Sequence, residues 1–525
     1  MASPLTATFS SRVGAVCIGS GRFLRAVLVP VLQGVGSDVI LFQTRGISFA
    51  NTCIAAGGFY EVDTIHHDGS TKTDVLKLEA VGSLAREDDR SAFLALPSRL
   101  PALRFIGLGV TDAAFVEGSS VMRDLAMFLH ACWTNIPGNT ISIINTDNVP
   151  LNGEVIKRYV SMKQDNLFST KWRTFRLVLQ AQWAERPTGE TLERFTMYLN
   201  EMVHFHNTMV DRLTSHRPEN DLVPLAEPWP SKVLCIQDSI GVLDRNAFEA
   251  IGGVYIRPTR ESLLLDQKLK LRVANATSSA LVYVLSLSRF RTNNEARLLP
   301  DVLQYRDQLF DHDILPSLLA EGAPEDLVKS LYNEWKIRSS HPHFGLVNLW
   351  VTQNAWMHFN ARLFSTIRAN VTRDIAYRSS PAMTFLAASI LRFLTPTGGP
   401  IKRGGRLVYR GRMDAPTASV PAYGGHASDD WIYGSDLHAD LSSGEYEFAD
   451  APNFPVAERL AKLAPAPHRT PEQTARVVYD ALGLLEGFDP SIVGFQAFAD
   501  DVSRSYEQLT SGRAALEVLQ DVIRH

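Results

Sequence analysis

The sequence predicts an α/β protein in which a doubly wound, mostly parallel sheet is followed by a mostly α-helical second half. Three observations support this fold class. Short apolar runs alternate with helix-like segments in the first 155 residues, at 13–18, 39–42, 103–110 and 140–145. A glycine-rich turn follows the first of these runs. From Lys270 onward the apolar pattern has mainly the period of a helix.

Bulk composition indicates a globular protein of two domains. The 525 residues are 45% hydrophobic and 21% charged, which is ample material for a core. We place the sheet domain at residues 1–250 and the helical domain at 251–525. A formal charge of −4 gives no reason to expect a nucleic-acid partner, so small-molecule chemistry is favoured.

The sequence also predicts a cytoplasmic location. No apolar run reaches the roughly 18 residues that a membrane span needs, so we expect no membrane partner. Four cysteines are scattered without C-x-x-C spacing, which is typical of reduced, packed thiols rather than of disulfides or a metal site.

The turn after the first apolar run carries Gly19 and Gly21 and leads into a helix-like pattern. A strand that delivers such a turn to a helix N-terminus cradles a pyrophosphate with backbone N–H groups, as in Rossmann-like folds. Leu24 stands where the usual fingerprint has its third glycine. A plain tight turn is the alternative interpretation.

The ends of two later strands bear on the choice of cofactor. Arg45 follows the second strand, where NAD enzymes usually carry an acid and where an arginine can pair with a 2′-phosphate. Arg45 therefore favours NADP, although a solvated loop charge explains it equally well. Thr111 follows the strand at 103–110, where we expect a loop against the cofactor. We keep both NAD and NADP.

The stretch from Lys270 to Asn275 contains the candidate catalytic residues of the second half of the chain. On an α-helix, residues five apart diverge by roughly 140°, so both side chains cannot lie at the centre of one core-facing stripe. A lysine in a water-poor pocket can act as a general base, and an asparagine can hold a developing alkoxide. The structural alternative is a snorkelling lysine and a locally bonded asparagine.

The second half is predicted to be helical apart from one long interruption. The expected helices are 266–288, 300–319, 324–335, 345–370, 380–394, 454–463, 471–486 and 491–523. Residues 397–452 change from basic and glycine-rich to acidic and turn-rich. We interpret this segment as an irregular excursion or lid that is stabilised by opposite charges.

Three motifs resemble the polyol-specific long-chain dehydrogenase family, which includes mannitol and arabinitol dehydrogenases and the fructuronate and tagaturonate reductases. Residues 19–26 (GSGRFLRA) resemble the family's G-x-G-x-F-x-R-A turn. Residues 205–212 (FHNTMVDR) resemble its N-[ST]-[ML]-V-D-R signature. Residues 270–275 (KLRVAN) resemble its K-L-R-x-x-N-x-x-H helix.

Weaker similarities favour the tagaturonate reductase branch. Residues 354–362 (NAWMHFNAR) resemble its N-S-x-S-K-[FW]-K-x-R run, and residues 23–26 (FLRA) also fit it. The resemblance covers most of residues 13–395.

The resemblance implies a role for each matching residue. Lys270 would be the general base in alcohol oxidation, and Asn207 and Asn275 would hold the substrate oxygen with Asp238 nearby. The pyrophosphate turn would comprise Gly19, Gly21, Phe23 and Arg25. No metal would be needed, because the lysine does the work that zinc does in other alcohol dehydrogenases.

The sequence departs from the family at three positions of the expected substrate site. Ser278 replaces the histidine of the catalytic helix, and His358 replaces a substrate-binding lysine, whereas Arg362 is kept. Asn360 stands where the tagaturonate branch has another lysine. The lost cation weakens the case for a carboxylate-bearing substrate. Ser278 implies an altered substrate or a slower rate.

Two hypotheses follow. The first is a metal-independent NAD(P)-dependent oxidoreductase that interconverts a keto sugar or keto sugar acid and the corresponding polyol or aldonate. A tagaturonate/altronate pair fits the local motifs, and a neutral polyol such as mannitol or arabinitol fits the missing cation. The second is a catalytically degenerate member that binds a dinucleotide without turning over.

Overall fold

The structure is a computed structural model, and it divides into two compact units that are described separately. It describes residues 5, 8–110, 119–160, 189–217, 220–403, 405–415, 430–433, 437–440, 442–449, 451–463 and 468–524. The units comprise residues 1–267 and 268–525. This division falls later than the predicted boundary at 250, because β13 (Val254–Arg257) pairs with β12 (Leu234–Gln237) of the first unit.

The first unit contains a six-stranded parallel sheet with strand order β5-β2-β1-β6-β7-β8. Numbered by their succession in the chain, these strands run 3-2-1-4-5-6, the order of dinucleotide-binding doubly wound sheets. The predicted fold class is thus confirmed. The strands are β1 (Val13–Ile18), β2 (Asp38–Gln43), β5 (Ala80–Ser83), β6 (Phe105–Leu108), β7 (Ile141–Asn145) and β8 (Val203–His206).

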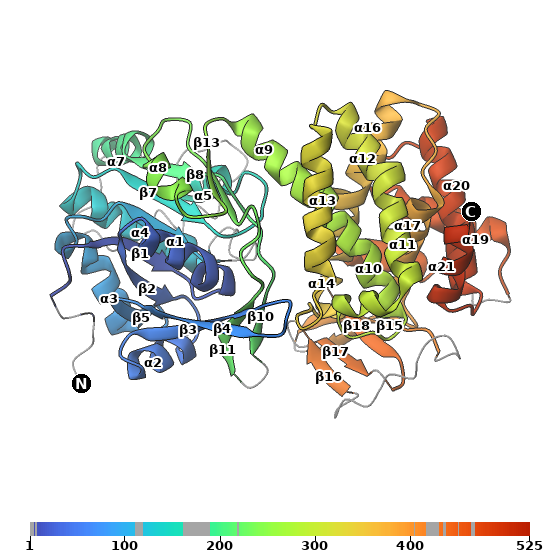
Figure 1. Cartoon of the computed structure of the whole chain (residues 1–525), viewed down its shortest axis with the longest axis horizontal. Coiled ribbons are helices and arrows are strands. Elements are labelled where there is room, and N and C mark those ends of the chain that lie inside the picture. Colours follow the sequence, from blue (N-terminus) through green and yellow to red (C-terminus); the bar gives the residue numbers. More distant parts are fainter. Residues whose placement is uncertain are drawn as a thin grey trace. The chain divides into compact units, whose positions relative to one another are not determined.

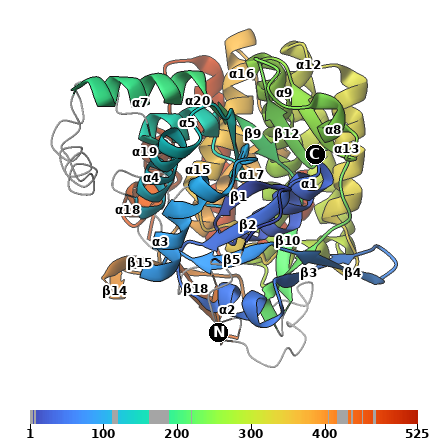
Figure 2. The ribbon, with the colours of Figure 1, turned by 90° about the vertical axis from the view of Figure 1, so that its left-hand side faces the viewer.

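Side chains of this sheet alternate between two cores, one on each face. Val16 and Ile18 of β1 belong to the core that includes α3 (Glu87–Ala95) and α4 (Ser120–Asn135). Ala15 and Cys17 belong to the other core, with η2 (Leu24–Leu28), α1 (Val29–Gly34) and α2 (Ser48–Ala55). Figure 2 shows α4 and α1 on opposite sides of β1. A sheet buried on both faces explains why its strands are continuous apolar runs.

Two smaller sheets complete the first unit. One has the order β10-β11-β3-β4, and the other has the order β13-β12-β9. The sequence did not predict β8 to β11, because β8, β9 and β10 have only three or four residues each and Pro224 interrupts the apolar run of β11. Their elements are β3 (Phe59–Ile65), β4 (Thr71–Lys77), β9 (Thr208–Val210), β10 (Thr214–Arg217) and β11 (Asn220–Ala226), and the remaining helices are α5 (Asn152–Val160), α7 (Gly189–Glu201) and α8 (Arg245–Glu249).

The second unit is built mainly from helices (Figure 1). Every residue of α10 (Ala276–Leu287) is buried, as is most of α17 (Pro381–Phe393), so these two helices form its centre. The predicted helix 491–523 is two helices, because Gly512 adopts a φ of +99° and ends the first. The other helices are α11 (Pro300–Leu309), α12 (Leu315–Ala320), α13 (Glu325–Ser339), α14 (Asn348–Val351), α15 (Ala355–His358), α16 (Ser365–Arg373), α18 (Phe454–Leu460), α19 (Pro471–Leu482), α20 (Val493–Thr510) and α21 (Ala515–Arg524).

The prediction of an irregular excursion at 397–452 is wrong for the described part of that segment. It forms a five-stranded antiparallel sheet of order β14-β15-β18-β17-β16. Tyr446 stacks on Phe393 of α17 with ring centroids 4.6 Å apart, and Arg403 pairs with Glu447 at 2.8 Å. Charges and glycines hid the strand pattern in the sequence. The strands are β14 (Ile401–Arg403), β15 (Arg406–Arg412), β16 (Asp430–Tyr433), β17 (Leu437–Asp440) and β18 (Glu445–Phe448).

Four π-helical turns interrupt α-helices within the described residues. They are η2, η5 (Lys270–Asn275), η7 (Phe310–Ile314) and η8 (Phe359–Phe364). In η5 the N–H of Ala276 bonds to the carbonyl of Leu271, five residues back. Such turns are rare and are frequent at functional sites. Three of the four contain residues that the sequence assigns to the site.

None of the helices in the described part of the chain is long and apolar enough to span a membrane.

Candidate functional site

The glycine turn lies where the strand order of the large sheet reverses. Gly19 follows β1 with a φ of +114°, a conformation that favours glycine, and its N–H donates to the carbonyl of Phe42 at 2.7 Å. A Cβ on Gly19 would collide with the carbonyl oxygen of Gly109, just after β6, and one on Gly21 would lie 3.2 Å from it. Ligands of doubly wound sheets bind at such a switch point, and this bare backbone fits a pyrophosphate.

Leu24 replaces the third glycine of the fingerprint, and the opposite strand compensates for it. A Cβ added to Gly109 would lie 2.5 Å from the Cβ of Leu24, and one added to Gly107 would lie 3.0 Å from Leu28 Cδ2. The close helix–strand contact that the third glycine normally allows is therefore kept. The glycines that allow this contact, Gly107 and Gly109, lie in β6 and just after it instead of in the helix.

Arg25 supports the glycine turn from inside the protein. Its side chain is 4% exposed, and Nε donates to the carbonyl of Ser20 at 2.8 Å. Its guanidinium also donates to the carbonyl of Leu222 in β11 and lies 4.7 Å from the ring centroid of Phe49. Phe23 is half-buried and packs against the same core. Arg25 thus fixes the position of the turn through protein contacts.

The end of β2 presents an arginine to solvent. Gln43 is buried, and its side-chain amide is used inside the protein: Nε2 donates to the carbonyl of Arg45 at 2.8 Å, and Oε1 accepts from the N–H of Ala50 at 3.1 Å. Arg45 itself is exposed and accessible to a phosphate. Thr111, also predicted to face the cofactor, lies outside the described residues.

Asn207 has its side-chain amide fully engaged at the start of α5. Its Oδ1 accepts from the N–H of Glu154 at 3.1 Å, and its Nδ2 donates to Gln237 Oε1 at 2.9 Å and to Glu154 Oε1 at 3.3 Å. Glu154 also faces Arg260 at 3.6 Å. Asn207 can therefore donate to a substrate oxygen by releasing the longer of its two donated bonds, the one to Glu154.

Asp238 stabilises the loop after β12. Its Oδ1 accepts from the N–H of Gly241 at 3.0 Å and its Oδ2 from the N–H of Leu243 at 2.8 Å. Asp238 is only 6% exposed, and each of its carboxylate oxygens accepts a hydrogen bond from a backbone N–H. The sequence assigned Asp238 to the substrate site. In the structure Asp238 directly follows Gln237, whose side-chain oxygen accepts from Asn207.

His206 precedes Asn207 and is held in one tautomer. Its Nδ1 lies 2.7 Å from the carbonyl of Gln237 and its Nε2 lies 3.1 Å from Ser142 Oγ. Because a carbonyl only accepts, Nδ1 carries the proton and Nε2 accepts from the serine. Burial lowers the pKa of His206, which the bond to Gln237 partly offsets. The imidazole is therefore neutral at neutral pH.

The helix that leads to Lys270 is anchored at its last turn within the first unit. Asp266 of α9 (Arg260–Leu269) pairs with Lys232 at 2.6 Å and with Arg257 at 2.5 Å. Gln267 donates to the carbonyl of Thr208 in β9 at 3.1 Å. The chain then continues as helix into η5, which begins at Lys270.

In the second unit, η5 changes the relation between Lys270 and Asn275. They are the first and last residues of a π-helical turn, in which hydrogen-bonded partners are five residues apart. Residues five apart are then one turn apart and face the same side. The divergence expected from an α-helix is wrong here. Both side chains are half-buried, so an amine and an amide can meet one oxygen atom.

A group of buried polar side chains surrounds Arg362 of η8. Its Nη1 donates to Ser279 Oγ at 3.3 Å, and no carboxylate pairs with it among the described residues. Burial lowers the pKa of Arg362 to about 10. The hydroxyl of Tyr283 and Nδ1 of His358 are buried without a hydrogen-bond partner in the described residues. Ser278, one residue before Ser279 in α10, is 8% exposed.

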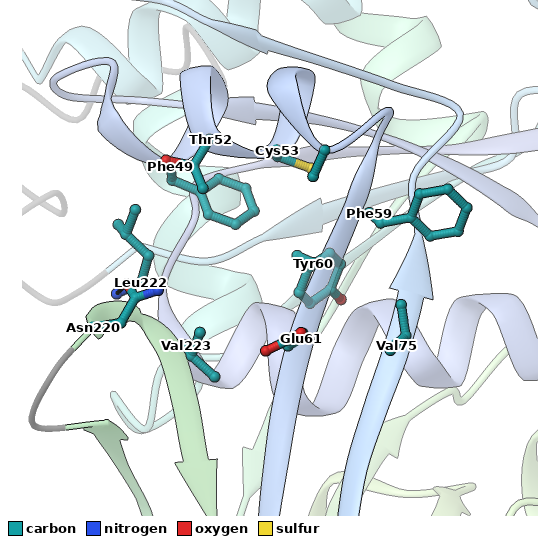
Figure 3. A pocket seen from close by; sticks show the side chains of 11 residues that line it. Phe49, Thr52, Cys53, Phe59, Tyr60, Glu61, Val75, Asn220, Leu222 and Val223 are labelled. Atoms are coloured by element: carbon teal, nitrogen blue, oxygen red, sulfur yellow. Dashed lines mark hydrogen bonds between the residues drawn. The ribbon is translucent and has the colours of Figure 1, made fainter.

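A cavity of about 250 Å³ lies in the first unit. Figure 3 shows the side chains that line it. Phe49 of α2 and Leu222 of β11 line it, and both contact the Arg25 guanidinium. Tyr60, another lining residue, donates to the Arg25 carbonyl at 2.9 Å. The walls are mostly apolar, and neither a predicted catalytic nor a predicted substrate-binding residue lines them. This cavity is therefore distinct from the candidate active-site residues.

Among the described residues, no group of three or more histidine, cysteine, aspartate and glutamate side chains is placed to hold a metal ion. The four cysteines are free and buried.

Comparison with curated proteins gives mannitol 2-dehydrogenases, whereas no protein-family model matches the chain. The enzymes of Neosartorya fischeri and Aspergillus fumigatus are each 24% identical to it over 339 residues. The match covers 58% of this chain and 64% of each relative, so the chain spans less than two thirds of their length.

Solved structures of similar fold include two sugar-alcohol dehydrogenases. Pseudomonas fluorescens mannitol 2-dehydrogenase, in a ternary complex with NAD and D-mannitol, aligns with a TM-score of 0.65 at 15% identity, covering 98% of this chain and 96% of that one. A substrate-free D-sorbitol dehydrogenase aligns with a TM-score of 0.58 at 16% identity, covering 74% and 82%. These likenesses show that the fold is shared.

The close approach at the glycine turn can be tested with two alanine substitutions. We expect Gly19→Ala to lower the free energy of unfolding by more than about 2 kcal/mol, because backbone strain and a collision with Gly109 add up. Gly36→Ala is the control, since Gly36 has a φ of +83° but open space around its Cβ position. Urea unfolding measures both, and equal losses would show that the close approach costs nothing.

His206 predicts a pH dependence of stability. Its pKa is lowered in the fold, so below about pH 6.5 the unfolded chain binds a proton that the folded chain does not. Its contribution is complete above that pH and is lost as the pH falls, by at most about 1.4 kcal/mol per pH unit. We expect the unfolding free energy of His206→Gln to fall less steeply than that of the wild type between about pH 6.5 and 5. Identical slopes would contradict the prediction.

Proposed function

We propose that this chain is an NAD(P)-dependent oxidoreductase that interconverts a polyol and the corresponding keto sugar, with Lys270 rather than a metal ion as the acid–base group. The observation that carries the proposal is the π-turn η5, which puts Lys270 and Asn275 on the same side of one helix. The mannitol 2-dehydrogenases that the chain resembles supply the reaction class.

The proposed roles of Lys270 and Asn275 both concern the hydroxyl oxygen of the substrate. In its neutral form, Lys270 takes the proton of the substrate hydroxyl while the carbinol carbon loses a hydride. The Asn275 NH₂ donates to that oxygen as negative charge develops on it. In the reverse direction the Lys270 ammonium returns the proton to the carbonyl oxygen. NAD(P)⁺, when bound, accepts the hydride.

The residues present fit a dinucleotide. Gly19 and Gly21 let the turn lie directly against the backbone of Gly109, so the turn carries no side chain that would cover its N–H groups, and the helix that begins after them offers further N–H groups to a pyrophosphate. The structural relative's NAD favours NAD as the cofactor, whereas exposed Arg45 at the end of β2 leaves a partner for a 2′-phosphate. Measuring turnover with both nucleotides decides between them.

Mannitol- or sorbitol-like neutral polyols are the first candidate substrates, because the similar proteins carry those names and His358 brings no charge. A keto sugar acid or its aldonate, such as the tagaturonate/altronate pair, is the second. A specific observation favours it: Arg362 is half-buried and has no carboxylate partner among the described residues, and the nearby buried Tyr283 hydroxyl has no hydrogen-bond partner among them either. A substrate carboxylate would accept from these donors.

The acid–base assignment is tested by Lys270→Ala. We expect kcat for polyol oxidation to fall by about 10²- to 10⁴-fold, because the proton loses its acceptor, while nucleotide binding measured by calorimetry is unchanged. Lys329→Ala is the matched control, since Lys329 is 52% exposed and pairs only with the same-helix Glu325 in the described contacts. Full activity of Lys270→Ala would refute the mechanism. Nucleotide binding by the wild type without turnover of any substrate would support the degenerate alternative.

The substrate class is tested with matched pairs and Arg362→Gln. If a carboxylate binds Arg362, kcat/KM for altronate should fall by about 10- to 100-fold in the variant, whereas kcat/KM for mannitol should change little. Arg368→Gln, which alters an arginine whose guanidinium donates to the carbonyl of Glu486, serves as the control. Equal losses for the charged and the neutral substrate would rule out a carboxylate at Arg362.

A further inference from the structure

Arg272 lies inside η5, between Lys270 and Asn275, and cross-links this turn to two other helices. Its side chain is 7% exposed. Nη1 donates to Ser317 Oγ at 3.1 Å and to the Glu321 carboxylate, both at α12. Nη2 donates to the carbonyl of Ser365, the residue that directly follows η8, at 3.2 Å. One guanidinium therefore holds three segments together.

Glu321 completes this cluster. Besides Arg272 it accepts from Lys268 Nζ at 2.5 Å. Burial raises the pKa of Glu321, but the bonds from Lys268 and Arg272 outweigh that effect, so the pKa is lowered and the carboxylate is charged at neutral pH. Two cations that flank Lys270 in the sequence thus share one carboxylate.

A second arginine links the same two π-turns in the opposite direction. Arg362 of η8 donates to Ser279 Oγ at 3.3 Å, and Ser279 Oγ donates to the carbonyl of Asn275 at 2.9 Å. Arg272 thus reaches from η5 to the end of η8, and Arg362 reaches from η8 to the first turn after η5.

These cross-links bear on the helical register. A π-turn is a rare departure from the α-helix and persists only where tertiary contacts hold it. If η5 relaxed to an α-helix, Lys270 and Asn275 would diverge by roughly 140° and could not meet one oxygen atom. Arg272 lies inside η5, and its side chain binds both α12 and the residue that follows η8.

We infer that Arg272 is a positioning residue: by tying η5 to α12 and to the end of η8, it keeps Lys270 and Asn275 on one side of the π-turn. The inference rests on the proposed function for its catalytic consequence. Arg272 itself does not need to touch substrate or cofactor.

The test compares Arg272→Lys with Arg306→Lys. Lysine keeps the charge but lacks the planar fork that spans Glu321 and Ser365. We expect kcat to fall by about 100-fold in Arg272→Lys, with the KM for nucleotide unchanged, because small misplacements of reacting groups cost that much. Arg306 is equally buried and bonds to Asp307 and Ser339, but it contacts neither η5 nor η8 in the described structure. Arg306→Lys should keep kcat.

A second measurement does not depend on turnover. Hydrogen exchange of peptides that cover residues 269–277 should be faster in Arg272→Lys than in the wild type and unchanged in Arg306→Lys. Equal exchange in all three proteins, or loss of kcat in proportion to lost thermal stability in both variants, would overturn the inference. A wild type that turns over no polyol, together with faster exchange in Arg272→Lys, would refute the proposed function and leave the positioning role standing.

Discussion

One additional residue in a single helical turn is the constraint on which the candidate active site depends. Lys270 and Asn275 come from a stretch whose neighbours on both sides are ordinary α-helix. Without the π-turn the two side chains would point to different sides of the helix and could not contact the same substrate atom. With it, a base and a hydrogen-bond donor share one side, which is what removing a proton from an alcohol requires.

The chain on each side of this turn is held by contacts within its own unit. On its N-terminal side, Asp266 is held by two cations in the first unit. On its C-terminal side, α10 is buried along its whole length, so rotation would force a core to repack. In between, Arg272 and Glu321 supply charge-assisted bonds, which are stronger than neutral ones and more specific in geometry. Strong contacts therefore converge on the segment that carries the proposed chemistry.

Much of the fold was predictable because its strands are buried on both faces and their sequences are continuous apolar runs. The break at Gly512 was missed, because the apolar period continues across it, although glycine commonly ends helices. The π-turns were not predictable, because no residue pattern distinguishes them from α-helix and long-range partners such as Glu321 stabilise them. For the site, motif spacing led to Lys270 and Asn275, but it assigned Arg25 to the cofactor without indicating its bonds to Ser20 and Leu222.

The pairing of a large residue on the helix, Leu24, with a glycine on the strand side, Gly109, limits how this region can evolve. Leu24 occupies space that Gly109 leaves empty, so the two positions share one volume. A mutation that enlarges either of them alone would wedge the helix off the sheet, whereas a paired change, small on the helix and larger on the strand, preserves the fit. In evolution, a small residue should therefore be present at both position 24 and position 109 before the large residue moves from the helix to the strand side.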